Sequence, residues 1–208
     1  MKKKILRIGK ARLIQIALLS ALALIAVSCQ KDDLQLKGEF SRSASALNEA
    51  PGLNRAPAPG DASIAGIAIA AGFSELVGAL LYVDEEFDAG LVDLFLNGTD
   101  QYTVFAPTNE AFENLYSALE IDEISDLPAE LVLDVLLYHV TEGRRAANSV
   151  VPPRGTRTIT TLLGETFSVD REGVITDIAG QEVAIVDANI SASNGIIHVI
   201  NTVLLPLE

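Results

Sequence analysis

The hydrophobic positions of this chain form two long runs near the N-terminus and several short β-branched runs near the C-terminus. The second long run, residues 63–82, contains Glu75 near its middle and a glycine at position 72. A carboxylate at the centre of a bilayer costs roughly 2.5 to 3.5 kcal/mol on insertion scales. We therefore interpret this run as two short core helices and not as a membrane span. The break is expected at Gly72 and Phe73, with Ser74 capping the second helix.

The segment YTVFAPTNEAF, residues 102–112, predicts a strand followed at once by a helix. Its first four residues alternate as in a strand, and Pro107 keeps the residue before it extended. Thr108 can accept a hydrogen bond from the first helical turn. Phe105 and Phe112 are expected to face one common core from either side of this corner.

A further helix is predicted over residues 128–140. Leu131, Val135 and Tyr138 recur there at helical spacing, and Gly143 supplies the expected stop. The segment ends with the pair Tyr138-His139, which contains one of the two histidines of the chain.

After Val150 the chain consists of short β-branched runs separated by turn residues. The strands are expected at residues 158–162, 165–170, 174–177, 182–186 and 196–205, and the turns at Gly164, Glu172-Gly173, Ala179-Gly180 and Asn194-Gly195. Asn194-Gly195 favours a positive φ in a tight turn, and the spacing is typical of antiparallel hairpins. Because helices come first and strands follow, we predict one α+β domain over residues 61–208.

The first thirty residues are typical of an export signal. A basic stretch precedes the apolar residues 13–27, which are too few for a bilayer-spanning helix but suit the core of a signal peptide. Cys29 follows small residues, as in the lipobox of bacterial lipoproteins, although Ala26 stands where that motif has Leu, Val or Ile. We predict a signal peptide over residues 1–28 and lipidation of Cys29. A plain secretory signal is the alternative.

Residues 29–60 are predicted to form a disordered tether behind the acyl chains. They mix Ser, Ala, Asn, Gly and Pro with scattered charges and hold few large apolar side chains, so burial cannot offset the entropy of ordering them. The tetrapeptide QKDD, residues 30–33, resembles the acidic tether that sends Bacteroidetes lipoproteins to the outer face of the outer membrane. A surface-exposed outer membrane lipoprotein is therefore expected, with an inward orientation as the alternative.

The charge balance narrows the classes of partner. The 208 residues include 15 basic and 28 acidic side chains, for a net charge of −13. Six of the basic residues lie in the first twelve positions, so the chain after Ser28 has nine basic against 28 acidic residues, a net of −19. Such a surface repels phosphate backbones and anionic lipid headgroups. This excludes nucleic acid as a partner and leaves the lipid anchor as the only expected membrane contact.

Composition also argues against metal and cofactor sites. The single cysteine excludes a disulfide framework and a cysteine metal cluster. Two acidic clusters, residues 84–88 and 120–126, lack the ligand spacing and central glycine of a calcium loop, so we interpret them as solvated edges. We expect neither a metal nor a cofactor.

Catalysis would have to use one of the two histidines, His139 and His198. A hydrolase would pair one of them with a carboxylate and a serine, for which the candidates are Asp134, Asp187, Ser191 and Ser193. No nucleophile elbow and no HxxxH or HxH metal spacing is present. Each imidazole is therefore expected to be buried and bonded to backbone groups, and we predict that the chain is not an enzyme.

Three stretches together resemble the signature of one family. TVFAPTNEAF at residues 103–112, NGIIHVINTVLLP at residues 194–206 and Tyr138-His139 between them are similar to the two signature boxes and the Tyr-His motif of the fasciclin (FAS1) domain family. The resemblance extends over residues 61–208. It implies an α+β wedge of about seven mostly antiparallel strands with a flanking helical layer.

The resemblance also implies roles for individual residues. It gives a mainly structural role to Thr103, Phe105, Pro107, Thr108, Phe112, Asn194, Gly195 and His198. Tyr138 and His139 are its candidate partner-binding residues. Two departures are Asn201, where the family usually has Asp, and Asn189, where Asp-Ile is common. The departure at Asn189 argues against the acidic adhesion motif that some animal members use.

The function that this resemblance implies is a surface-anchored, non-catalytic cell-adhesion or interaction module. Its partner would be a protein or glycan on a cell surface or in a matrix. The alternative is a glycan-binding accessory lipoprotein of a polysaccharide-uptake system. In that case exposed tyrosines such as Tyr82 or Tyr116 would contact the sugar.

Overall fold

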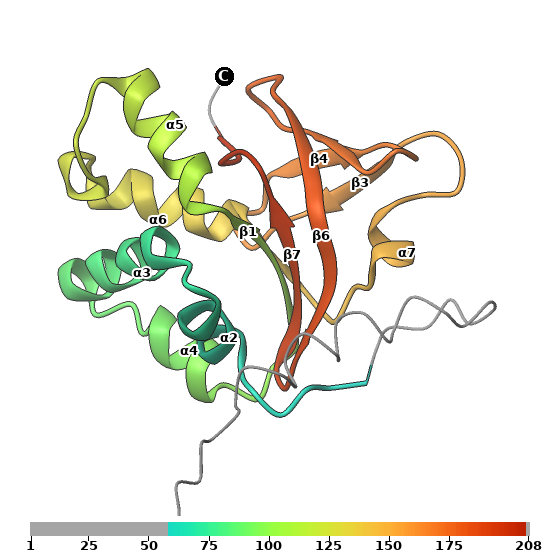
Figure 1. Cartoon of the computed structure of the whole chain (residues 1–208), viewed down its shortest axis with the longest axis horizontal. Helices are drawn as coiled ribbons and strands as arrows, with labels where there is room; N and C mark the ends of the chain where they lie inside the picture. The colour runs from blue at the N-terminus through green and yellow to red at the C-terminus, as the bar shows by residue number, and fades with distance from the viewer. Residues whose placement is uncertain (1–57, 207–208) are drawn as a thin grey trace, which may run out of the picture. The chain divides into compact units, whose positions relative to one another are not determined.

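The computed structural model describes residues 58–206. The predicted signal peptide, the predicted lipidation site Cys29 and the predicted tether up to residue 57 lie outside the described residues. In the described part, helices gather on one side and a curved sheet on the other (Figure 1). This arrangement confirms the predicted α+β fold class.

Most of the helices come first in the chain, as the sequence predicts. They are α2 (Ile64–Ala71), α3 (Ser74–Phe87), α4 (Leu91–Asn97), α5 (Asn109–Leu119), the 3₁₀ turn η1 (Ile124–Asp126), α6 (Ala129–Tyr138) and α7 (Ala147–Val150). The strands are β1 (Tyr102–Pro107), β2 (Val140–Glu142), β3 (Arg157–Thr160), β4 (Thr166–Val169), β5 (Val174–Thr176), β6 (Glu182–Ala192) and β7 (Gly195–Ile200). Within residues 58–206, no helix is long and apolar enough to cross a membrane.

The strands form a seven-stranded sheet in the order β2-β1-β7-β6-β5-β4-β3. All neighbouring strands are antiparallel except β1 and β7, which pair in parallel. The pairing of β6 with β7 shifts register between Ile185 and Asp187 and again between Asp187 and Ile190. Such irregularities bend a strand. One end of β6 therefore pairs with β5 and the rest pairs with β7, which curves the sheet.

Two buried clusters stabilise the domain, one between the helices and the sheet and one inside the curved sheet. Phe112 belongs to the first cluster, whereas Phe105 belongs to the second and packs edge-on against Phe167. The expectation that Phe105 and Phe112 share one core is therefore wrong. Successive side chains of a strand point to opposite faces, and β1 is covered on both, so Val104 enters the first cluster and Phe105 the second.

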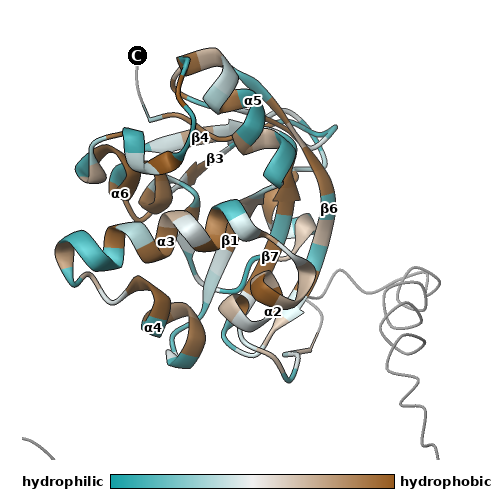
Figure 2. Cartoon of the chain, turned by 60° about the vertical axis from the view of Figure 1, so that its left-hand side comes forward, coloured by the Kyte–Doolittle hydropathy of each residue, from teal (hydrophilic) through white to brown (hydrophobic). Residues whose placement is uncertain are grey.

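The apolar run over residues 63–82 forms two helices, as predicted. Gly72 ends α2 with a φ of 79°, a left-handed conformation that glycine adopts without strain. The predicted cap at Ser74 is wrong, because Ser74 is the first residue of α3 and Phe73 precedes it without a capping side chain. Ser63 instead caps α2 by accepting a hydrogen bond from the Gly66 N–H. The hydropathy of α2 is uniformly apolar, in contrast to the mixed colouring of α5 (Figure 2).

The helix predicted over residues 128–140 ends earlier than expected. Helix α6 stops at Tyr138, and Val140 already belongs to β2, which pairs with β1. Gly143 therefore ends a strand and not a helix, and its φ of 82° serves the turn after β2. Pairing with β1 competes with the last helical turn for the same backbone groups, a tertiary effect that spacing does not reveal.

Helix α4 was not predicted, and the acidic cluster at residues 84–88 positions it. The half-buried Asp84 carboxylate accepts hydrogen bonds from the Leu91 and Val92 N–H groups, each at 2.8 Å. These are donors of the first turn of α4, which has no capping side chain of its own. The interpretation of this cluster as merely solvated is therefore wrong for Asp84.

Candidate functional site

Tyr138 lies at the end of α6 and is fully buried. Its hydroxyl donates to the Thr166 carbonyl at 3.0 Å and accepts from the Ile178 N–H at 3.3 Å. Its ring meets Phe167 edge-on, with centroids 5.9 Å apart. Burial raises the pKa of the phenol to about 12, so the side chain stays neutral and ties α6 to the second cluster.

His139 follows Tyr138 and is only 3% exposed. The contact of its Nδ1 with the Val135 carbonyl is 2.6 Å, and the Leu204 N–H donates to its Nε2 at 3.0 Å. A carbonyl can only accept, which places the proton on Nδ1. Burial lowers the pKa of this imidazole to about 4. The ring is therefore neutral at pH 7, and both its nitrogens are bonded to backbone.

Unlike His139, which lies between α6 and β2, His198 lies in β7, where it is also buried. Its Nε2 is 2.9 Å from the Arg145 carbonyl, and its Nδ1 accepts from the Asn189 N–H at 3.4 Å. The proton is therefore on Nε2. Burial lowers the pKa of this imidazole as well. Its ring packs against Phe105 at a centroid distance of 5.5 Å.

These bonds leave neither histidine available as a catalytic base. Among residues 58–206, no hydrogen bond joins either ring to a serine hydroxyl or a carboxylate. Ser191, one of the candidate nucleophiles, instead donates to the Ala58 carbonyl and accepts from Arg144. No group of three or more metal-ligating side chains occurs in the part of the chain that the structure describes.

Asn194 and Gly195 join β7 to the helical layer. The Asn194 side chain, 2% exposed, accepts from the Ile64 N–H at 2.8 Å and donates to the Phe95 carbonyl at 3.0 Å. Neither Asn194 nor Gly195 has a positive φ, so that expectation is wrong. Glycine is required for another reason: a Cβ on Gly195 would lie 2.1 Å from the Tyr102 carbonyl oxygen.

Replacing Asn194 by alanine is expected to lower the free energy of unfolding by about 2 kcal/mol, because it leaves a buried N–H and a buried carbonyl without partners. Urea unfolding followed by circular dichroism would measure this loss. Asn97→Ala is the control, since the Asn97 amide bonds only the exposed Asp93 carboxylate in the described structure. A loss at Asn194 no larger than that at Asn97 would contradict the assignment.

The remaining motif residues position β1 and α5. Thr103 donates to the Gly143 carbonyl at 2.7 Å and accepts from the Arg145 N–H at 2.8 Å. Thr108 caps α5 by accepting from the Ala111 N–H at 3.2 Å, as predicted. Pro107 is opposite Ile200 in the parallel β1–β7 pair. All these contacts stabilise the fold.

Sequence reasoning missed Arg144, which binds the start of the domain to the β6–β7 hairpin. Its guanidinium donates to the Ala192 carbonyl at 2.8 Å, to the Gly195 carbonyl at 2.5 Å and to the Ala58 carbonyl at 3.2 Å. Most of these acceptors are backbone carbonyls, which every residue carries. No pattern of residue types could therefore have identified the arginine.

The tyrosines expected to contact sugars are not exposed platforms. Tyr116 is 8% exposed, and its hydroxyl donates to the Glu75 carboxylate at 2.8 Å. Tyr82 is half-buried, and its hydroxyl donates to the Leu127 carbonyl at 3.0 Å. The expectation that they are exposed is therefore wrong for both side chains, and burial leaves Tyr116 little ring surface for sugar stacking.

An apolar groove opens between α5, η1 and α6, and we call it the α5–α6 groove. It encloses about 140 Å³, and its walls include Phe112, Leu119, Leu131, Val135 and Leu205. A smaller apolar cavity of about 50 Å³ lies against α2, α3 and α4. His139 lines both and separates them together with Leu76 and Leu136. These hollows lie directly beside the buried Tyr-His motif.

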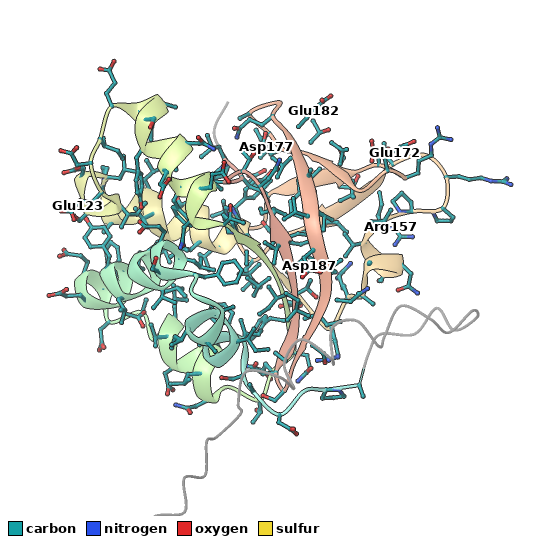
Figure 3. The ribbon with its side chains drawn as sticks, viewed as in Figure 1. Glu123, Arg157, Glu172, Asp177, Glu182 and Asp187 are labelled. Atoms are coloured by element: carbon teal, nitrogen blue, oxygen red, sulfur yellow. The ribbon has the colours of Figure 1, made fainter. Side chains whose placement is uncertain are left out.

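Charge is distributed very unequally between the two halves of the domain. Residues 58–143 contain 17 acidic side chains and no Lys or Arg. Residues 144–206 contain five arginines and six acidic side chains. Figure 3 shows the two ends of this distribution: Glu123 projects from the helical side and Arg157 from the opposite side of the domain. The surface around the α5–α6 groove is therefore strongly negative.

The structure also places the candidate partner-binding pair. Tyr138 and His139 are both buried, so neither ring forms part of the exposed surface, although His139 lines the α5–α6 groove. Their partner-binding role stays a prediction, and any such role has to act through the surface above them. Of the two hollows that His139 lines, the α5–α6 groove is the larger, at about 140 Å³ against about 50 Å³.

Comparison with known proteins gives consistent results. The model of the fasciclin domain matches residues 71–206. The immunogenic protein MPB70 of Mycobacterium bovis is 38% identical over 116 residues, which cover 56% of this chain and 54% of that protein. The cell surface glycolipoprotein MPB83 of the same species is 37% identical over 119 residues, 57% of this chain and 49% of that protein. The chain thus spans about half the length of these relatives.

A solved structure shows the same fold. It is a FAS1 domain pair from the insect cell adhesion molecule fasciclin I, with a TM-score of 0.52 and 17% sequence identity. The match covers 71% of this chain and 51% of that chain. At this identity the likeness concerns the arrangement of helices and strands alone.

Proposed function

This chain belongs to the fasciclin domain family, and we propose that it is a non-catalytic interaction module of the adhesion type. Acyl chains on Cys29 anchor it to the outer membrane, and the tether that begins at residue 29 presents the domain outside the cell. The last residues of the predicted tether instead belong to the domain, because Ala58 and Gly60 bond Arg144, Ser191 and Ala192. Its partner is a protein or glycan on another surface or in a matrix. Of the two, a protein partner fits the described residues better, because the side chain of Tyr116 is buried and that of Tyr82 is half-buried, which reduces the ring surface available to a sugar.

The observation that carries the non-catalytic part is the bonding of the two histidines. Each ring is buried and uses both nitrogens in hydrogen bonds to backbone atoms. A general base needs a free nitrogen within reach of the proton that it removes. The hydrogen bonds of His139 and His198 instead hold α6, β7 and the C-terminal segment together.

The names of similar proteins support the extracellular part of the proposal. MPB83 is described as a cell surface glycolipoprotein, and the solved FAS1 pair comes from a cell adhesion molecule. Both descriptions agree with the predicted export signal, and the first also agrees with a lipidated Cys29. The acidic composition of the chain agrees as well, since it disfavours adsorption to the anionic lipid of the anchoring membrane.

The full chain, produced in a bacterium with an outer membrane, tests this proposal. Metabolic labelling with an alkyne fatty acid is expected to label the wild-type chain and not Cys29→Ser. Protease added to intact cells should remove the domain, and cells carrying the wild type should adhere better to matrix-coated or cell-coated surfaces than cells carrying Cys29→Ser.

Three results would contradict the proposal. A wild-type chain without label, or equal labelling of Cys29→Ser, would exclude acylation of Cys29, and a domain that resists protease until lysis would lie on the inner side. A substrate turned over by the purified chain, with loss of turnover but not of melting temperature in His139→Ala or His198→Ala, would show an enzyme.

A further inference from the structure

The α5–α6 groove suggests what kind of partner this module binds, an inference that rests on the proposed function. We propose that the groove receives one apolar side chain of about phenyl size from a basic peptide segment of a protein partner. Three features of the described residues carry this inference: the size of the groove, its access to solvent and the charge around it.

The volume and lining of the groove suit a single apolar side chain. An apolar cavity of about 150 Å³ holds one benzene ring, and the groove encloses about 140 Å³. Its floor is made by buried side chains such as Phe112, Val132 and Leu136. His139 adds no polar group that an occupant would leave unpaired, because its nitrogens already bond Val135 and Leu204.

The groove is accessible from the surface. Leu119 lines it and is 46% exposed, and Leu131 and Val135 on α6 are half-buried. Burying such exposed apolar surface is favourable at about 25 cal/mol per Å². Interfaces take most of their binding energy from a few apolar anchors seated in pockets of this kind.

The negative charge around the groove indicates that the partner's peptide segment, which carries the apolar side chain, is basic. The stretch from α5 to α6, residues 109–138, holds eight acidic side chains and no Lys or Arg. On α6, Glu130 and Asp134 are exposed and lie one turn apart on the stripe next to Leu131 and Val135. Lys or Arg residues on both sides of the partner's apolar side chain would meet these carboxylates.

The same charge disfavours two other occupants. The groove of a second copy carries the same acidic residues, so two grooves facing each other would repel. An anionic lipid or a fatty acid carboxylate would meet the same negative field. A cationic protein segment is the occupant that gains from both the apolar walls and the acidic surroundings.

The test uses the full-length lipoprotein in detergent micelles and a synthetic peptide in which one Phe is flanked by two Lys on each side. Titration followed by methyl NMR should show saturable shifts at Leu131 and Val135. A peptide with Ser in place of Phe, and one with Glu in place of Lys, should each bind at least about tenfold more weakly. The first lacks the apolar side chain that fills the groove, and the second lacks the positive charge that meets the carboxylates. Raising the salt concentration should weaken binding of the Phe-Lys peptide, because salt screens its attraction to the carboxylates.

Two variants of the chain locate the site. Val135→Phe fills the groove and should weaken binding of the Phe-Lys peptide about tenfold. Val186→Phe, at a 57% exposed position on β6, should leave binding unchanged. The double variant Glu130→Gln/Asp134→Asn keeps the shape of α6 and should weaken binding roughly two- to fivefold. Its matched control is Glu165→Gln/Glu182→Gln, which removes the same charge from the strand side and should leave binding unchanged. Melting temperatures confirm that all variants fold.

Several results would overturn the inference. Failure of the Phe-Lys peptide to bind, or binding that Val135→Phe does not weaken in a folded chain, would show that the groove is not the site. Tighter binding of dodecanoate than of the peptide would show a lipid site. A dimer that only Val135→Phe dissociates would show that a second copy occupies the groove. The proposed function fails separately: cells that adhere normally while the peptide does not bind would refute the groove alone. Cells that do not adhere while the purified chain binds the peptide would refute the adhesion role alone.

Discussion

Replacing Gly195 by alanine is expected to lower the free energy of unfolding by about 3 to 5 kcal/mol. The new Cβ would lie 2.1 Å from the Tyr102 carbonyl oxygen and 2.6 Å from the Ile64 side chain. A side chain can rotate away, but the carbonyl belongs to the start of β1 beside β7. The two strands would have to separate at this end.

Chemical denaturation of Gly195→Ala measures this loss, and Gly78→Ala is the control of opposite sign. A Cβ on Gly78 would meet no atom within 4 Å, and Gly78 lies inside α3. Alanine there should stabilise the domain by about 0.5 to 1 kcal/mol, because it favours the helix. A Gly195→Ala protein as stable as the wild type would show that β1 and β7 can move apart at this end without loss.

Acidification is expected to destabilise the domain through its two buried histidines. Burial lowers the pKa of His139 from 6.5 to about 4 and lowers that of His198 in the same direction. The unfolded chain therefore takes up protons below pH 6.5 that the folded chain refuses. This contribution to stability is complete above pH 6.5 and is lost as the pH falls towards 4. Between pH 7.5 and 5, His139 alone accounts for about 2 kcal/mol.

Urea unfolding of the wild type and of His139→Gln at pH 7.5 and pH 5 tests this prediction. Glutamine does not titrate, so the difference in stability between the two pH values should shrink by about 2 kcal/mol, even though the variant is less stable throughout. The hydrogen bond to the Val135 carbonyl and, to a smaller extent, the negative charge of Asp177 partly oppose the effect of burial on the pKa of His139. Wild type and variant with the same pH dependence would mean that His139 titrates normally in the folded domain.

The local features of the fold could be predicted where neighbouring residues determine them. The end of α2 at Gly72, the cap of α5 at Thr108 and the strands β3, β4 and β5 follow from short-range geometry. The last two strands are predicted less well, because β6 runs on past residue 186 to Ala192 and β7 ends at Ile200 and not at residue 205. The predictions that fail depend on partners distant in sequence. Gly195 is needed for its close approach to Tyr102, and α6 ends at Tyr138 because the next residues pair with β1.

Part of the candidate site could also be predicted from the sequence, and part could not. The sequence could indicate that His139 and His198 are buried, because each lies in an apolar run and lacks catalytic neighbours at recognisable spacing. It could not reveal the α5–α6 groove. Leu119, Leu131 and Leu205 lie on three segments, and only folding brings them around one hollow.

For the tethered module proposed above, the way in which the chain enters the domain has a mechanical consequence. Ala58 is held by Arg144 and Ser191, and the backbone of Gly60 and Ala62 bonds the β6–β7 hairpin at Ala192 and Ser193. A pull transmitted along the anchor would therefore act on the hairpin and the guanidinium before it could unwind α2. From the hairpin, the Asn194 side chain would pass this load on to the helical layer at Ile64 and Phe95.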